Sequence, residues 1–256
     1  MPYFRCPIAP GLFLVLALLG CGPGGGSRAG GEARRVIDRA ILAHYGRVPD
    51  TLDVTFRFRN RNYRIHRRGG EYAYGRDYPD TLADGRVQTV RDELTNDGLA
   101  RTVDGVAVEL TAKERGAAAR AVNSVRYFFL LPYGLNDPAV NARLLDTTTI
   151  DGRTYDRVRV TFDRAGGGRD YEDVYHHYFN RETGELDYLA YNFAVNGGGV
   201  RFREATNKRR LGGVLFQDYV NYGLDGDTAL ARVERRFANG ELRQLSRIEN
   251  VSIVLY

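Results

Sequence analysis

Short segments in which apolar and polar residues alternate follow one another through most of this chain. Residues 51–59 read TLDVTFRFR, in which every second residue from Leu52 to Phe58 is apolar. A period of two places apolar side chains on one face of a β-strand and polar ones on the other. Turn dipeptides such as Asp104-Gly105 and Asp151-Gly152 stand between these segments. The pattern predicts antiparallel strands joined by tight hairpins.

About ten strands of this kind are predicted along the chain. Because tight turns make consecutive strands neighbours, we expect one continuous meander, and a long twisted sheet curls. The strands are expected over or around residues 51–59, 63–65, 72–74, 101–103, 106–108, 144–150, 157–162, 171–179, 186–195, 200–205, 214–222 and the C-terminal segment that ends at Tyr256.

Three helices are predicted among these strands. Residues 32–45 repeat apolar side chains at the helical spacing of 3.6 residues. A second helix, over residues 111–131, begins with Thr111 and Glu114, which match a capping box. A third is expected over residues 227–238.

These elements predict an α+β fold that is mostly antiparallel β. We expect a curved sheet that forms an open or half β-barrel, with the helices against its concave face. Residues 32–256 are expected to make a single domain, long enough to bury a substantial core.

The N-terminus predicts export and lipidation. Residues 1–20 have one early positive charge and a short apolar stretch, as in a signal peptide, and Leu18-Leu19-Gly20-Cys21 resembles the lipobox of bacterial lipoproteins. We therefore expect lipid on Cys21 and a flexible tether over residues 21–31; the alternative is an ordinary signal peptide with an incidental cysteine. Cys6 is the other cysteine, so no disulfide and no cysteine-based metal site or catalysis is expected in the mature chain.

The predicted location of the protein and the distribution of its charge limit the kinds of partner that it can bind. The tether contains no acidic residue, which favours a lipid-anchored protein of the cell envelope, on the outer membrane and facing the periplasm. The net charge is +5, and lysine occurs only at positions 113 and 208. The arginines alternate with acidic and apolar residues instead of clustering in a recognisable module, so we expect no nucleic-acid binding. No motif indicates a cofactor.

Four stretches carry a resemblance to a known family: residues 123–141, 166–173, 197–207 and 216–222. In these stretches the chain resembles an uncharacterised lipoprotein family of Bacteroidota, and the likeness extends over nearly all of the mature chain. The family's general plan resembles the lipoprotein-carrier half-barrel of the LolA and LolB type. That resemblance implies a concave face that shelters acyl chains. The uncharacterised family has no established activity to transfer to this chain.

His176 and His177 are the main catalytic or metal-binding candidates. Neighbouring side chains of a strand point to opposite faces, so the two imidazoles do not share a metal through this strand alone, and no metal site is expected. One of them paired with an acid from another strand gives a hydrolase-type alternative. Hydrogen-bonded structural histidines are the other interpretation.

Two charged residues fall on strands that we expect to be buried on one face. Asp218 shares a face with Phe216, so we expect an ion pair with a residue such as Arg203, because an unpaired buried charge costs several kcal/mol. The pair is interpreted either as a structural link or as a polar anchor for a ligand headgroup. The glycine triplets at 166–168 and 197–199 have strands on both sides, which favours hairpin loops over phosphate loops.

Seventeen Tyr and 12 Phe without any Trp suit a surface that holds a lipid or a flat ligand. The preferred hypothesis is a non-enzymatic module that binds a hydrophobic or amphipathic ligand, such as a lipid or acyl chain, between the sheet and the helix at 111–131. The alternatives are an assembly lipoprotein that docks an envelope protein, and the hydrolase. The candidate ligand-binding residues are Phe128, Tyr133, His177, Tyr188, Arg203, Asp218 and Tyr219.

Overall fold

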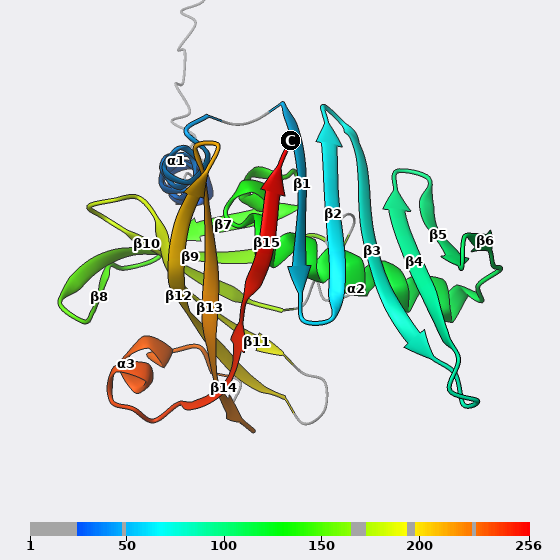
Figure 1. The fold of residues 1–256 in the computed structure, drawn as a ribbon. Coiled ribbons are helices and arrows are strands. Elements are labelled where there is room, and N and C mark those ends of the chain that lie inside the picture. The colour runs from blue at the N-terminus through cyan, green and yellow to red at the C-terminus, as the bar shows by residue number, and fades with distance from the viewer. Residues whose placement is uncertain (1–24, 48–49, 165–172, 194–197, 227–228) are drawn as a thin grey trace, which may run out of the picture.

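Two antiparallel sheets and the helices that cover them make up the fold in the computed structural model (Figure 1). The structure describes residues 25–47, 50–164, 173–193, 198–226 and 229–256. The predicted signal peptide, Cys21 and the loop at 166–168 lie outside these ranges. Within the described ranges, the helical segments are α1 (Gly25–Tyr45), α2 (Ala112–Leu130), α3 (Val233–Ala238) and the 3-10 turn η1 (Tyr133–Asn136).

The first sheet is a hairpin meander with the C-terminal strand added at one edge. Its strand order is β15-β1-β2-β3-β4-β5-β6, and every pairing is antiparallel. The strands are β1 (Thr51–Phe58), β2 (Arg61–Arg68), β3 (Glu71–Thr81), β4 (Val87–Thr95), β5 (Gly98–Val103), β6 (Val106–Ala107) and β15 (Asn250–Leu255).

The second sheet follows in the chain and has the order β14-β13-β12-β11-β10-β9-β7, with β8 also paired to β9. The predicted strand at 144–150 is divided in two, because β7 and β8 pair with different parts of β9. The strands are β7 (Val140–Leu144), β8 (Thr148–Ile150), β9 (Arg153–Phe162), β10 (Tyr175–Asn180), β11 (Leu186–Phe193), β12 (Gly199–Leu211), β13 (Val214–Asp225) and β14 (Arg243–Ile248).

The chain joins the two sheets at their edges. Strand β14 ends one sheet, and after Glu249 the chain continues as β15 at the edge of the other (Figure 1). The predicted fold class is confirmed: the sheets are antiparallel, curved and open, and neither closes into a barrel. The expectation of one continuous meander is wrong, because β15 pairs with β1 and the single predicted C-terminal strand is two strands in different sheets.

Local turn and cap signals are confirmed. Asp104 and Gly105 have φ of 48° and 82°, the left-handed pair that a two-residue hairpin requires. Asp151 and Gly152 repeat this conformation with φ of 48° and 77°. Helix α2 begins with the predicted capping box, in which the Glu114 backbone N–H donates to the Thr111 hydroxyl.

The other two helices differ from the prediction in length. Helix α1 begins at Gly25, before the predicted residue 32, and so includes part of the segment expected to be a tether. Helix α3 covers only Val233–Ala238 of the expected 227–238. Leu230, Val233 and Phe237 nevertheless pack inward, as their spacing predicts. No helix among the described residues is both apolar and long enough to cross a membrane.

Strand β4 has no counterpart in the prediction, and Asp92 is the reason. This carboxylate is fully buried between Val90 and Leu94, where an alternating pattern would carry an apolar residue. Arg76 and Arg101, its cross-strand neighbours, hold it with hydrogen bonds of 2.6–3.0 Å. A buried ion-paired cluster therefore takes the place of an apolar contact in this sheet.

The second sheet is buried on both faces. Its inner face, with the first sheet, α1 and α2, forms the main core, which includes Val158, Leu189 and Phe216. Its outer face packs under α3 in a second core built around Phe202 and Tyr178. Consequently, most of the space that the curved sheets enclose is filled by side chains.

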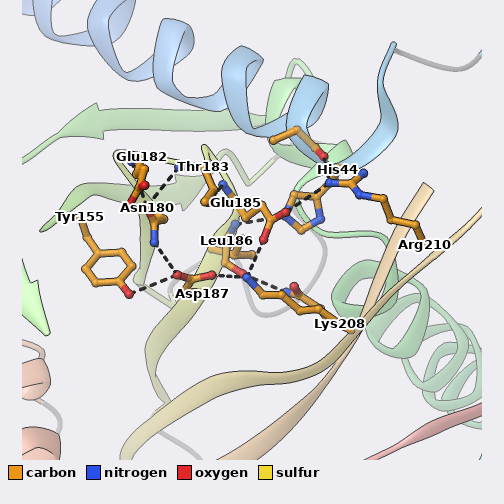
Figure 2. A network of polar contacts seen from close by, with 12 residues as sticks. His44, Tyr155, Asn180, Glu182, Thr183, Glu185, Leu186, Asp187, Lys208 and Arg210 are labelled. Carbon is orange, nitrogen blue, oxygen red and sulfur yellow. Dashed lines mark hydrogen bonds and ion pairs between the residues drawn. The ribbon is translucent and has the colours of Figure 1, made fainter. Parts of the chain in front are cut away.

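A network of polar contacts fixes the C-terminal end of α1 to the second sheet (Figure 2). The backbone N–H of Leu186 donates to Nε2 of buried His44 at 3.0 Å. Arg210 reaches both the Ala43 carbonyl of α1 and Glu185, and Lys208 pairs with Glu185. Burial, followed by the positive charges of Lys208 and Arg210, lowers the pKa of His44 to about 3, so this ring is neutral. The contacts place α1 across the edge of the second sheet.

Candidate functional site

A cleft of about 260 Å³ remains between the C-terminal half of α2 and the inner face of the second sheet. Its volume lies near the lower end of the ~300–1,000 Å³ that is usual for small-molecule sites. Exposed Ser124 of α2 and Arg59, just after β1, stand at its rim. The cleft lies where the sequence predicts a ligand, between the sheet and the helix at 111–131.

One wall of the cleft is apolar and aromatic. Helix α2 contributes Val125, Phe128 and Phe129, and the end of β1 contributes Phe58, while Ile248 of β14 adds an apolar side chain on the sheet side. The ring of Phe129 stacks on Phe56 of the first sheet at a centroid distance of 3.7 Å and so anchors the helix there. This wall suits a hydrocarbon chain, because contact with it removes apolar surface from water.

The opposite side of the cleft carries polar groups in one row across the sheet. The strand register places Arg203 of β12 beside Asn221 of β13, and Asn221 beside Ser246 of β14. Directly paired residues of antiparallel strands present their side chains on the same face. On β11, the strand on the other side of β12, the residue paired with Arg203 is Leu189, which belongs to the main core. The row is therefore apolar at β11 and polar from β12 to β14, where it lines the cleft.

Arg203 is a buried cation, only 8% exposed. Its guanidinium lies 3.9 Å from the centroid of the Phe128 ring and donates one hydrogen bond, 3.1 Å long, to the hydroxyl of Tyr191. Its Nε–H has no acceptor within the described part of the chain. No carboxylate occurs among the described residues that line the cleft, while Arg59 adds a second positive charge at the rim. The cleft is therefore electropositive.

Asp218 forms the ion pair that the sequence predicts, but its partner is Arg209 and the suggested partner Arg203 is wrong. Asp218 is instead held by Arg209 at 3.2 Å, by the side-chain amide of Asn207 at 2.7 Å and by the backbone N–H of Asn250 at 2.9 Å. The register of β12 against β13 shifts between residues 206 and 209. This bulge brings Arg209 to the carboxylate. Arg203 pairs in register with Asn221, whereas Asp218 pairs with Thr206, so Arg203 and Asp218 lie on opposite faces of the sheet.

Two further polar groups of the cleft complete its chemistry. The Oδ1 atom of Asn221 is buried and accepts no hydrogen bond within the described residues. The Tyr219 hydroxyl accepts a hydrogen bond from Gln217 at 2.7 Å. Burial raises the pKa of Tyr219 to about 12, although the Gln217 hydrogen bond and the charge of Arg203 act the other way. A neutral phenol and an amide oxygen thus lie close to the buried cation.

Of the predicted site residues, Phe128, Arg203 and Tyr219 line the cleft, and the others lie elsewhere. Tyr133 is in η1, with its ring edge-on to Tyr45 at 5.5 Å. Tyr188 belongs to the outer core under α3, and its hydroxyl is 3.4 Å from Asp151.

The two adjacent histidines point to opposite faces of β10, as predicted. His177 is fully buried in the inner core, stacked between Tyr175 and Phe179. His176 pairs in register with Ala190 of the outer core. Burial lowers the pKa of His177 to about 3 and, with the charges of Arg157 and Arg159, that of His176 to about 4.

The hydrolase alternative requires one of these imidazoles beside an acid in a cleft. Within the described ranges, neither ring nitrogen of His177 has a hydrogen-bond partner, and Nδ1 of His176 has none. The described residues also contain no group of three or more His, Cys, Asp or Glu able to hold a metal. The acids at 170 and 172 lie outside the described ranges. The described geometry therefore does not supply the pair that this hypothesis needs.

Several cleft residues were not predicted. Asn221 follows Tyr219 by two positions, and strand alternation alone could have placed it on the same face. Phe58, Ser246 and Ile248 come from elements far apart in the sequence. They meet because the chain passes from β14 in the second sheet to β15 beside β1 in the first, and no local pattern indicates that passage.

Comparisons with known proteins give a family and a likeness of fold. The model of a family described as of unknown function, DUF6503, matches residues 25–251. Among curated proteins no relative matches the sequence.

Two solved structures extend over most of the chain. A LolA superfamily protein from Nitrosomonas europaea is 12% identical, with 88% of this chain and 93% of that one covered and a TM-score of 0.47. A DUF1329 family protein from Desulfovibrio piger is 10% identical, with 86% and 92% covered and a TM-score of 0.48. A LolA superfamily protein is thus among the solved structures to which the chain is similar, as the sequence suggests, and a likeness at these TM-scores identifies neither a ligand nor a partner.

Proposed function

Since the chain belongs to the family of unknown function DUF6503, we propose its function from the cleft itself: it binds a hydrophobic or amphipathic ligand, a lipid or an acyl chain, between α2 and the second sheet. The observation that carries this proposal is a cleft with an aromatic wall on α2 and a polar row on the facing strands. A chain-like ligand places its hydrocarbon against the wall and its headgroup at the row. The small volume favours a single chain.

The proposal includes an anchor in the cell envelope. Lipid on Cys21 would hold the protein to a membrane. The expected membrane is the outer membrane, with the protein facing the periplasm. Each buried acyl methylene contributes about 0.8 kcal/mol, so several chains keep a protein on a bilayer. Replacing Cys21 by Ser is expected to move the protein from the membrane fraction to the soluble fraction. If the variant stays with the membranes, the lipid anchor is excluded.

Ligand binding is tested by native mass spectrometry of protein purified from membranes, together with fluorescent fatty-acid probes. The matched variants are Ser124→Trp and Asn123→Trp. Both residues are exposed on α2, but only Ser124 lines the cleft. We expect a lipid-sized adduct and saturable probe binding in the wild type and in Asn123→Trp, and loss of both in Ser124→Trp. Equal binding by the two variants, or no binding by the wild type, contradicts the proposal.

A second candidate function is docking of an envelope protein. The observation that favours it is β15, an edge strand of the first sheet: its Val251 and Val254 are 40% and 46% exposed, and Tyr256, just after the strand, is 75% exposed. An edge strand with exposed apolar side chains is a template for pairing with another chain. Pull-down from membranes tests this: one partner in fixed stoichiometry that is lost on Val254→Lys supports docking, and an unchanged set of proteins rejects it.

A further inference from the structure

Arg203 lies at the polar end of the cleft and has no carboxylate partner within the described part of the chain. Two partly buried arginines elsewhere in the sheets are neutralised: Arg157 pairs with Glu234 at 2.7 Å, and Arg76 pairs with Asp92 at 2.8 Å. Removing a guanidinium from water costs several kcal/mol unless a negative group compensates. Arg203 has a hydrogen bond to a neutral phenol and a cation–π contact, and its Nε–H has no acceptor among the residues that the structure describes.

The strand register aims this side chain at the cleft. Arg203 shares its row with Asn221 and Ser246, and all three line the cleft. Asp218 of the neighbouring strand is the partner that the sequence suggests for Arg203. This carboxylate is already held by Arg209 and by the Asn250 backbone N–H. The protein's own groups thus leave the guanidinium edge available in a site that also offers an apolar wall.

We propose that Arg203 binds the negatively charged headgroup of the ligand, so that the cleft takes an anionic single-chain amphiphile such as a fatty-acid carboxylate. This inference rests on the proposed function and specifies its ligand class. The planar guanidinium presents its N–H groups in a fork that matches carboxylate and phosphate oxygens. Phe128 orients that fork by stacking on its face, and the same ring begins the apolar wall against which the chain lies.

The test compares cis-parinaric acid with its methyl ester, which has the same fluorescent chain and no charge. Dissociation constants are measured at pH 7.5 for the wild type, Arg203→Gln and Arg203→Lys. Arg201→Gln is the control, because it removes the same charge from the same strand at a residue that does not line the cleft. Ester binding reports on the fold and the apolar wall in every variant.

We expect the wild type and Arg201→Gln to bind the acid roughly tenfold to a hundredfold more tightly than the ester, as a charge-assisted hydrogen bond provides. Arg203→Gln is expected to lose this preference while it binds the ester normally, and Arg203→Lys is expected to keep part of it. Dodecanoate and dodecyl phosphate should displace the probe, and inorganic phosphate at the same concentration should not.

Each contrary outcome has a distinct meaning. Equal binding of acid and ester by the wild type leaves the proposed function in place and overturns the charged headgroup. A preference that survives in Arg203→Gln and disappears in Arg59→Gln assigns the anion to the rim and overturns the role of Arg203. If inorganic phosphate displaces the probe, the site binds a free anion instead of an amphiphile, and the proposed ligand class is wrong. No binding of either probe overturns the proposed function together with this inference.

Discussion

Replacing Arg203 by Met is predicted to stabilise the protein when no ligand is added. The substitution removes a buried guanidinium that is 8% exposed and has no ion-pair partner among the described residues. The hydrogen bond that this charged group donates to Tyr191 contributes about 1.5 kcal/mol and the cation–π contact with Phe128 about 1–2 kcal/mol. The desolvation of an uncompensated cation costs several kcal/mol, which outweighs them. The net expectation is a gain of about 1–3 kcal/mol in the free energy of unfolding.

Arg157→Met in β9 is the matched comparison. Arg157 donates to Glu234 at 2.7 Å, and this carboxylate is only 7% exposed. Losing the cation leaves a buried carboxylate supported by the Tyr178 hydroxyl alone, at 3.0 Å. Breaking one side of a buried pair costs about 3–5 kcal/mol. The same chemical change is therefore expected to have opposite signs at the two positions.

The assay is urea unfolding of delipidated protein, followed by far-ultraviolet circular dichroism. With a slope of about 2 kcal/mol per molar urea, the midpoint should rise by about 0.5–1.5 M in Arg203→Met and fall by about 1.5–2.5 M in Arg157→Met. If Arg203→Met loses as much stability as Arg157→Met, the guanidinium of Arg203 is satisfied by the protein itself and its assignment to a ligand is wrong.

Three further predictions concern the fold. The pKa of His44 and His177 is lowered to about 3 and that of His176 to about 4, so their stabilising neutral forms are fully present above pH 6.5 and are lost as the pH falls toward those values. Each histidine destabilises the protein by about 2 kcal/mol by pH 5. His177→Phe should therefore reduce the slope of stability against pH that these three histidines cause by about a third. A slope unchanged by His177→Phe would contradict this. Asp92→Ala should lose about 3–5 kcal/mol in urea unfolding, since it leaves two arginines facing each other, and a loss below 1 kcal/mol would count against the buried cluster. Thr111→Ala should lower the free energy of unfolding by about 1 kcal/mol through the cap of α2, and no change in the urea midpoint would argue against that cap.

The sequence predicts the local parts of this fold well, because turns and caps depend on neighbouring residues. Asp104-Gly105 forms the expected hairpin, and the Thr111 capping box starts α2 where expected. Strand β4 is missed because Asp92 occupies a buried position that an apolar residue usually holds. Its partners Arg76 and Arg101 come from other strands, so their compensation of the charge is visible only once the sheet is assembled.

The same limit applies to the site. Arg203 and Tyr219 are both candidates from the sequence, and both line the cleft. The alternating pattern does not identify the partner of Asp218, since a bulge in β12 brings Arg209 to that carboxylate. A bulge, or a passage of the chain from one sheet to the other, changes which residues pair across strands. The alternation of apolar and polar residues in the sequence does not reveal either.

A crystal structure of the protein saturated with dodecanoate tests the central claim most directly. We predict one dodecanoate between α2 and the second sheet, with its chain against Phe128, Phe129 and Ile248 and its carboxylate within hydrogen-bond distance of the Arg203 guanidinium. A cleft filled by rearranged protein side chains, with dodecanoate bound elsewhere or not at all, would contradict the claim that this cleft is a ligand site.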